Sequence, residues 1–440
     1  MKTSLDATTR RTMLAAGSAI AGAGALAACG GPPGGTTPGA AQPSSGPVTI
    51  QYLGRGSAGE EEIYRDLIRQ FGERNPKITV DINWAGTGGS ALIAEKLTAL
   101  LAANTPPDTF WVHCYSTLDW VAQKALVDLT PYTKEKGFDL AGYYKGPLDD
   151  FRWEGQLLSL PRETSSLVMF FNKGQFGEAG VREPTADSTW NDWLEASRKL
   201  TREGGGGKIF GTFAAASGFN VFQMIWQNGG EIMNEKRTQS LFDSPQAIET
   251  VQFLTDLRVK HQVAPQPADY QGQTLPQFFL AGRMSSYTTG QNLALDLQKN
   301  NPFAWDAVAV PRNRQKAYAQ ASSGHGITRP SKQPAAGWEL VKWLAGEDAS
   351  KLYAARGLVI PALIKVTESD VFSGAGMPTN YGKTWRDALK EARSFGITRR
   401  WNDVLATLDK ELAPALEGAK PVPDAMRSLK QQVDQILAMP

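Results

Sequence analysis

Residues 48–114 read VTIQYLGRGSAGEEEIYRDLIRQFGERNPKITVDINWAGTGGSALIAEKLTALLAANTPPDTFWVHC, and this stretch decides the fold. Apolar and polar side chains alternate over 48–52 and 78–84, which predicts strands, and the apolar run 109–114 predicts a third. Between them, 60–74 and 91–103 repeat apolar side chains at helical spacing. Strands separated by such helices need crossover connections, so an α/β fold with a mostly parallel sheet is expected.

The chain from residue 48 to residue 440 is long enough for two domains. The mixed pattern continues through it. Ser188–Asp192 is typical of a helix start, and the glycines 204–207 end that helix. Asp243-Ser244-Pro245 opens another helix, with proline near its first position. No internal repeat is present, so the whole body is expected to be mixed helix and strand.

The N-terminus has the features of an export signal. Arg10 and Arg11 precede a weakly apolar Ala/Gly-rich run, which is typical of a Tat-type signal peptide over residues 1–28. Leu-Ala-Ala before Cys29 resembles the lipobox of bacterial lipoproteins, which predicts lipidation of Cys29. The alternative is an ordinary signal peptide with a chance cysteine. The protein is thus expected to be exported and anchored by lipid to the outer face of the cytoplasmic membrane, or to lie in the periplasm.

The segment 29–47 that follows is uncharged and consists of Gly, Pro, Thr, Ser, Ala and Gln after the cysteine, so it is predicted to be a flexible linker. With Cys29 lipidated, Cys114 has no partner for a disulfide and is expected to be a small buried apolar side chain. The chain carries 46 basic and 44 acidic residues. It has no basic excess for phosphates, which argues against a nucleic-acid partner.

The sequence lacks the usual catalytic and metal-binding motifs. Its three histidines, His113, His261 and His325, are far apart. The glycine run before Lys208 fails as a phosphate-binding loop, because the residue after the lysine is isoleucine. No Gly-x-Ser-x-Gly motif occurs. No catalytic residue, metal or cofactor is therefore expected, although the sequence leaves open whether two acidic residues face each other at glycosidase distance.

A series of short motifs then follows a familiar order. In chain order they are Asn104-Thr105-Pro106-Pro107-Asp108, Ala125-Leu126-Val127-Asp128-Leu129-Thr130, Gly155–Pro161, Phe170-Phe171-Asn172-Lys173, Thr189-Trp190-Asn191-Asp192-Trp193, Gly229-Gly230, Asp243-Ser244-Pro245, Phe279–Met284 and Ile360-Pro361. None is diagnostic alone. Their shared order resembles that of bacterial extracellular solute-binding proteins of family 1, the maltodextrin- and sugar-binding type of ABC importers.

The resemblance implies two α/β lobes, each a mixed sheet flanked by helices, joined by three crossings and closing by a hinge on a ligand. Lobe 1 is expected over 48–161 and 287–329, and lobe 2 over 162–286 and 330–440. The implied function is to capture a sugar or oligosaccharide and deliver it to ABC permease subunits, as a monomer. Alternatives are an exported glycan-active enzyme and a ligand-sensing lipoprotein without transport. A glycerophosphodiester or a polyamine are alternative ligands.

Candidate contacts come from strand ends and from the implied crossings. In open α/β sheets ligands bind beyond the carboxyl ends of strands, which favours Trp84, Ser90 and Tyr115. Glu163 could accept two sugar hydroxyls, or instead pair with Arg162 at the surface. The full candidate set is Trp84, Ser90, Tyr115, Glu163, Thr164, Asn220, Trp226, Tyr287, Asn292, Gly324 and His325.

The alternative role for several of these side chains is packing in the hydrophobic core. Trp84 could close the core of its lobe, and Trp226 fits a core as well as a cleft. Trp385 and Trp401 could cover the cleft, but both equally fit amphipathic helices. Asn292 stands where relatives often place a stacking tryptophan, which weakens the case for a long maltodextrin-like ligand.

Overall fold

The computed structural model describes residues 46–87, 89–213, 218–372 and 376–439. The predicted signal peptide 1–28, the lipidation site Cys29 and residues 29–45 of the predicted linker lie outside the described residues. Among the residues described, no helix is both long and apolar enough to cross a membrane.

The first sheet contains the three strands that the sequence predicts over 48–52, 78–84 and 109–114. Its order is β11-β6-β10-β3-β1-β2, and β12 pairs with β10. β1 runs parallel to β2 and β3, whereas β10 is antiparallel to β3 and β6, so the sheet is mixed. The strands are β1 (Val48–Gly54), β2 (Ile78–Trp84), β3 (Thr109–His113), β6 (Leu160–Ser165), β10 (Tyr318–Ile327), β11 (Ile360–Pro361) and β12 (Ala392–Ser394).

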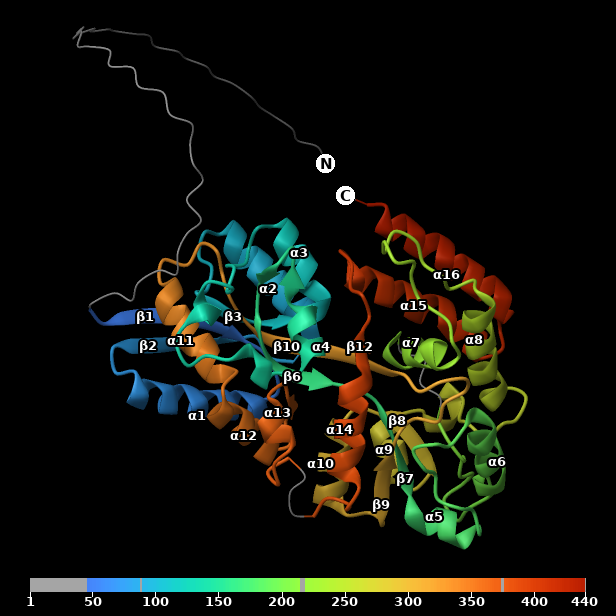
Figure 1. Ribbon diagram of the computed structural model, residues 1–440. Helices are drawn as coiled ribbons and strands as arrows, with labels where there is room; N and C mark the ends of the chain where they lie inside the picture. The colour runs from blue at the N-terminus through green and yellow to red at the C-terminus, as the bar shows by residue number, and fades with distance from the viewer. Residues whose placement is uncertain (1–45, 88, 214–217, 373–375, 440) are drawn as a thin grey trace, which may run out of the picture. The chain divides into compact units, whose positions relative to one another are not determined.

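Alternation along β1 sends side chains to two helical layers. Ile50 and Tyr52 pack on one face with Tyr64 of α1, while Leu53 packs on the other with Leu97 of α2. Figure 1 shows α1 and α12 on one side of this sheet and α2 and α3 on the other. The helices are α1 (Ala58–Arg74), α2 (Gly89–Ala102), α3 (Thr117–Ala122), α4 (Lys145–Asp150), α11 (Pro334–Leu344), α12 (Glu347–Ala355) and α13 (Ile364–Thr367).

The second sheet is smaller and has the order β8-β7-β9, antiparallel throughout. Its strands are β7 (Val168–Asn172), β8 (Ser286–Thr289) and β9 (Trp305–Val308), and a separate hairpin joins β4 (Arg152–Trp153) to β5 (Gln156–Leu157). The accompanying helices are α5 (Lys173–Glu178), α6 (Trp190–Leu200), α7 (Gly218–Gln227), α8 (Pro245–Arg258), α9 (Leu275–Leu280), α10 (Asn292–Asn300), α14 (Tyr381–Glu391), α15 (Trp401–Leu416) and α16 (Val422–Leu437).

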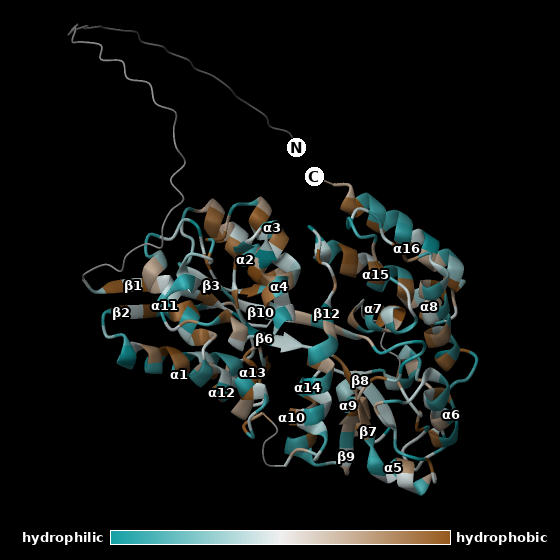
Figure 2. Ribbon diagram, in the orientation of Figure 1, coloured by the Kyte–Doolittle hydropathy of each residue, from teal (hydrophilic) through white to brown (hydrophobic). Residues whose placement is uncertain are grey.

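Several of these helices are amphipathic and bury one apolar face. Val422, Met426, Leu429 and Val433 are buried along one side of α16. Figure 2 shows the same alternation of teal and brown along α1 and α16. Two separate sheets, each with its own helices, form the two-lobed arrangement expected from the sequence.

The lobe boundaries remain a proposal, and strand pairing favours moving several segments between the lobes. Residues 162–165 were expected in lobe 2, but they belong to β6, which pairs with β10 in the first sheet. Residues 287–308 were expected in lobe 1, but β8 and β9 both pair with β7 of the second sheet. Residues 334–355 were expected in lobe 2, but α11 and α12 bury Leu340 and Ala349 in the cluster that contains Ile50. Single-chain motifs indicate the order of segments but not which sheet each joins.

Candidate functional site

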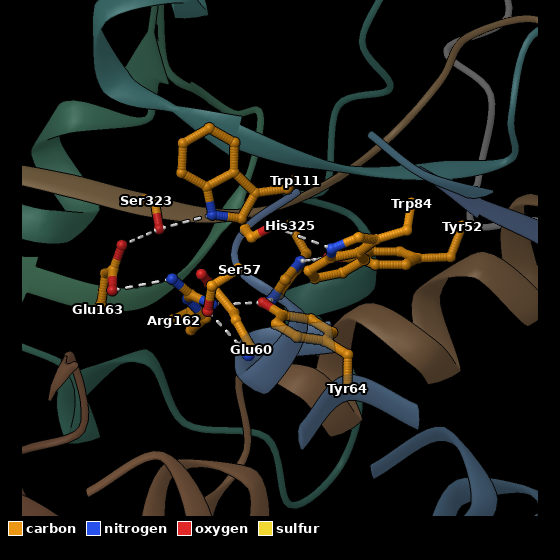
Figure 3. A network of polar contacts seen from close by, with 11 residues as sticks. Tyr52, Ser57, Glu60, Tyr64, Trp84, Trp111, Arg162, Glu163, Ser323 and His325 are labelled. Carbon is orange, nitrogen blue, oxygen red and sulfur yellow. Dashed lines mark hydrogen bonds and ion pairs between the residues drawn. The ribbon is translucent and has the colours of Figure 1, made fainter. Parts of the chain in front are cut away.

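A network of polar side chains, most of them buried, connects β1, α1, β6 and β10 in lobe 1 (Figure 3). Arg162 is only 2% exposed and lies between two carboxylates, with Glu163 at 2.9 Å and Glu60 at 3.3 Å. Its guanidinium also donates to the hydroxyl of Tyr64 at 2.5 Å. A charge this deeply buried is tolerated only when paired, and here it is paired on both sides. The expected Arg162–Glu163 pair thus exists, but inside the lobe rather than at its surface.

His325 belongs to the same network. Its Nδ1 lies 3.3 Å from the hydroxyl of Tyr52, and its Nε2 lies 3.5 Å from that of Tyr64. Burial, with Arg162 nearby, holds the pKa of His325 well below its usual range. A neutral imidazole offers one donor and one acceptor, which suits two hydroxyl partners. His325 is fully enclosed and stabilises lobe 1, although the sequence suggested a ligand contact.

Glu163 is where this network reaches the surface, because its side chain is 18% exposed. Ser323 donates to its Oε1, and Trp111 Nε1 donates to Ser323 Oγ at 3.0 Å. Both carboxylate oxygens therefore have one protein partner each. A carboxylate can accept about four hydrogen bonds, so room remains for hydroxyl donors from a ligand.

A row of aromatic rings starts at this point. The guanidinium of Arg55 lies 4.8 Å from the centre of the Trp111 ring. The His113 ring follows at 5.6 Å from Trp111, and the Tyr115 ring at 4.3 Å from His113. Burial lowers the pKa of His113 to about 4, so its imidazole is neutral near pH 7. His113 and Tyr115 are both half-buried.

The row continues into the second lobe through the segment that follows β12. The Phe395 ring lies 6.2 Å from Tyr115 and 5.0 Å from Phe219 of α7. It also stacks on Trp226 at 5.8 Å, and Arg393 covers that indole at 4.3 Å. We call this set the aromatic row; its members are Trp111, His113, Tyr115, Phe395 and Phe219. It brings rings from both lobes into contact, with Trp111 and Phe395 buried and His113, Tyr115 and Phe219 partly exposed.

A cavity of about 520 Å³ lies beside the row and is lined from both lobes. Cys114 and Asp150 line it from lobe 1, and Trp226 and Phe395 from the other side. Burial raises the pKa of Asp150 to about 7, although Gln320 donates to its Oδ2 at 2.7 Å. The volume falls within the range of small-molecule sites. Trp226, predicted as a contact or as core, forms a wall of this cavity.

Trp84 and Ser90, the strand-end candidates, lie apart from the row. Trp84 packs against Tyr64, with ring centres 5.3 Å apart, and its Nε1 donates to the carbonyl of Gly56 at 3.2 Å. A side chain at Gly54 would collide with the Trp84 ring, since a Cβ there would lie 2.3 Å from it. Ser90 instead donates to Asn402 Oδ1 of α15 at 3.3 Å.

Thr164 and Gly324 are interior positions of the first sheet. Thr164 is buried and donates to Gln320 Oε1 at 3.0 Å. A Cβ on Gly324 would lie 2.3 Å from the carbonyl oxygen of Leu160, so glycine is required there by the approach of two strands. Both are better explained by packing than by ligand contact.

The candidates in lobe 2 are scattered. Tyr287 packs between Phe213 and Phe279, at 5.7 and 6.0 Å between ring centres. Asn220 is buried within α7, and Asn292 is exposed as the first residue of α10. Of the predicted set, Tyr115 belongs to the row, Glu163 lies at its start, and Trp226 supports it.

Sequence reasoning missed Arg55, Trp111, Phe219 and Phe395 as site residues. Arg55 directly follows β1, so the strand-end argument that favoured Tyr115 would also have favoured it. Phe395 follows β12, which has only three residues, and no periodic pattern marks such a short strand.

Comparison with known proteins places this geometry in context. Residues 57–351 match the family model of the bacterial extracellular solute-binding proteins. A binding protein of Brucella abortus is 21% identical over 390 residues, which covers 85% of this chain and 89% of that protein. An arabinooligosaccharide-binding protein of Halalkalibacterium halodurans is 32% identical over 111 residues, or 25% of this chain and 24% of that one.

Among solved structures, an ABC substrate-binding protein of Listeria monocytogenes in complex with cycloalternan superimposes with a TM-score of 0.80. It is 25% identical, and the match covers 89% of this chain and 99% of that one.

Proposed function

Because the chain belongs to the bacterial extracellular solute-binding proteins, a family of binding proteins rather than enzymes, we propose that it captures a carbohydrate between its lobes. It then delivers this ligand, as a monomer, to the permease subunits of an ABC importer. The carbohydrate-binding relatives from Listeria monocytogenes and Halalkalibacterium halodurans support the ligand class.

The aromatic row is the observation that carries this proposal. Sugars present flat C–H surfaces that stack on aromatic rings, and hydroxyls that need acceptors and donors. Tyr115 and Phe219 are half-buried, so part of each side chain is open to solvent. Glu163 stands at the start of the row with acceptor capacity left. Contacting rings from both lobes suit a ligand that is held only when the lobes come together.

The charges near the row favour a neutral ligand over a phosphodiester. Arg393 is bound by both oxygens of Glu231, at 3.0 and 2.8 Å. Arg162 is already shared by two carboxylates. Within the part of the chain that the structure describes, Arg55 alone among these three arginines has no carboxylate partner. The cavity beside the row is also lined by Arg152 and Arg237. It is lined as well by Asp149, Asp150, Glu231 and Glu235, so it carries no excess of positive charge that would favour a phosphate.

Calorimetric titration of the purified protein with cyclic and linear glucans and with arabino-oligosaccharides tests the ligand class. Tyr115→Ala should weaken the affinity for the bound sugar about tenfold or more, because one stacked ring is lost. Tyr270→Ala is the matched control, since Tyr270 is also half-buried but packs on Phe213 away from the row. Binding of sn-glycerol 3-phosphate or spermidine, with no sugar bound, would overturn the proposal.

We further propose that the protein is exported by its Tat-type signal and anchored through Cys29. Cys29→Ser should move the protein from the membrane fraction to the soluble fraction, because one cysteine carries the acyl chains. Cys114→Ser is the control and should stay at the membrane, since Cys114 is buried in the body. A Cys29→Ser protein that remains membrane-bound would contradict the anchor.

A further inference from the structure

Helix α15 begins without a cap of its own. Arg400 precedes its first residue, Trp401, with a φ of 58°, and its side chain makes no capping hydrogen bond. The first N–H groups of a helix have no partner within the helix and need acceptors from elsewhere. Ser, Thr, Asp or Asn normally supply that acceptor from the cap position, and arginine has none to offer.

The other lobe supplies an acceptor for the backbone N–H of the cap residue itself. The backbone N–H of Arg400 donates to Asp119 Oδ1 at 3.0 Å. Asp119 lies in α3, whose Trp120 packs on Phe110 of β3 in the first sheet. A carboxylate at a helix N-terminus is also favoured by the helix dipole. Asp119 therefore caps a helix to which it does not belong.

A second bridge between the lobes lies two residues further along the chain, at Asn402. Asn402 Nδ2 donates to Ser116 Oγ at 3.3 Å, and Asn402 Oδ1 accepts from Ser90 Oγ at 3.3 Å. Ser116 and Ser90 both belong to lobe 1, from the turn after β3 and from the start of α2. The rest of α15 packs in lobe 2, where Trp401 lies 5.9 Å from Phe222 of α7. One carboxamide thus joins two elements of one lobe to a helix of the other.

We propose that Asp119, Ser116 and Ser90 form a latch with Arg400 and Asn402, so that the first turn of α15 is complete only while the lobes are together. When the lobes separate, Asp119 no longer accepts from the N–H of Arg400, and the first turn of α15 frays. When the lobes close, this hydrogen bond forms again. The latch rests on the two-lobed fold and deepens the proposed capture function, because a ligand held between the lobes leaves only when the latch opens. It adds stability to the closed state without touching the ligand.

Hydrogen exchange of the full-length, ligand-free protein, resolved to single amides, tests the latch directly. Asp119→Ala should speed exchange at Arg400 and at the next amides of α15 by about tenfold, because local opening becomes easier. Asp119→Asn keeps a neutral acceptor in place and should give an intermediate rate. The control is Asp409→Ala, which removes an exposed acidic group from the same helix beyond its first turn.

A change of less than twofold in Asp119→Ala, or an equal change in the Asp409→Ala control, would overturn the latch. Asn402→Ala combined with Ser116→Ala tests the second bridge. The two changes should together speed exchange no more than Asn402→Ala alone, since each breaks the same bond. Rates that multiply instead would show that the bridge does not form.

The exchange measurement needs no sugar, so its outcome is separate from that of the capture function. Where a glucan or arabino-oligosaccharide does bind, Asp119→Ala should raise its dissociation rate several-fold and leave its association rate within twofold. Unchanged dissociation would show that the latch does not hold the closed state. A protein that binds no sugar but shows the predicted exchange would refute the capture function alone.

Discussion

The buried network around Arg162 and the aromatic row around Tyr115 contain the same kinds of side chain, yet they differ in where those side chains find partners. In the network, most polar groups are paired with one another, as Arg162 is with Glu60 and Glu163, and among its described residues Arg162 Nε alone of that guanidinium's nitrogens has no hydrogen-bond partner. In the row, Tyr115 and Phe219 contact rings on their edges and keep surface open. Polar groups that are paired within the protein indicate a structural role, whereas ring surface that no protein group covers indicates a ligand site.

The largest loss of stability is expected when Arg162, at the centre of the buried network, is replaced. Arg162→Met leaves the buried Glu60 and the half-buried Glu163 without their shared cation, which should lower the free energy of unfolding by about 3–5 kcal/mol. Urea denaturation measures this. Arg65→Met is the control, because Arg65 pairs with Glu61 at the surface and should cost less than about 1 kcal/mol.

A loss below about 1 kcal/mol in Arg162→Met would erase the contrast between the two regions. It would mean that the carboxylates regain water or shift their protonation without strain. The network would then be open to solvent, and a ligand role for its residues would have to be reconsidered.

Trp84→Ala tests whether a side chain at the edge of the network contributes to stability rather than to sugar binding. The ring is half-buried against Tyr64 and fills the space over Gly54. Its loss should reduce the free energy of unfolding by about 2–3 kcal/mol, somewhat below the cost for a fully buried ring. Sugar affinity should change less than threefold. The control is Trp153→Ala, which removes an exposed tryptophan and should cost less than about 0.5 kcal/mol.

The contrast also explains what sequence could and could not foresee. Strand and helix periods are local, so β1, α1, β2 and α2 follow from residues 48–102 alone. The position of Tyr115 after β3 follows from the general rule for strand ends. His325 and Thr164 also lie in segments that the family places near the cleft, but their burial depends on partners about 150 residues or more away, such as Gln320 for Thr164. No local pattern encodes those partners.

A pH titration probes the row through His113. Its pKa in the folded protein is about 4, below the ordinary value of 6.5, so on acidification the unfolded chain takes up a proton before the folded chain does. The free energy of unfolding should therefore fall as pH drops from 7 to 5. His113→Gln should remove about 1–2 kcal/mol of that decrease, because the ring is half-buried and partly screened.

Urea denaturation at pH 7 and pH 5 measures this difference. His261→Gln is the control, since His261 hydrogen-bonds Arg198 at an exposed site and should leave the decrease nearly intact. If His113→Gln left the pH dependence unchanged, the His113 ring would be hydrated and not a packed member of the row.

Glu163→Gln has the smallest expected effect on stability and decides the comparison, because Glu163 belongs to the network and borders the row. The amide keeps its shape and an acceptor for Ser323, while Arg162 retains Glu60 and Tyr64. The free energy of unfolding should fall by only about 1 kcal/mol. Sugar affinity should fall about tenfold, since a charged acceptor binds hydroxyls more strongly than an amide. Calorimetry and urea denaturation of one preparation give both numbers, with Glu61→Gln as the surface control. A variant that loses several kcal/mol of stability while its affinity holds would place Glu163 wholly within the network, and the ligand would then bind further along the row, beyond Tyr115.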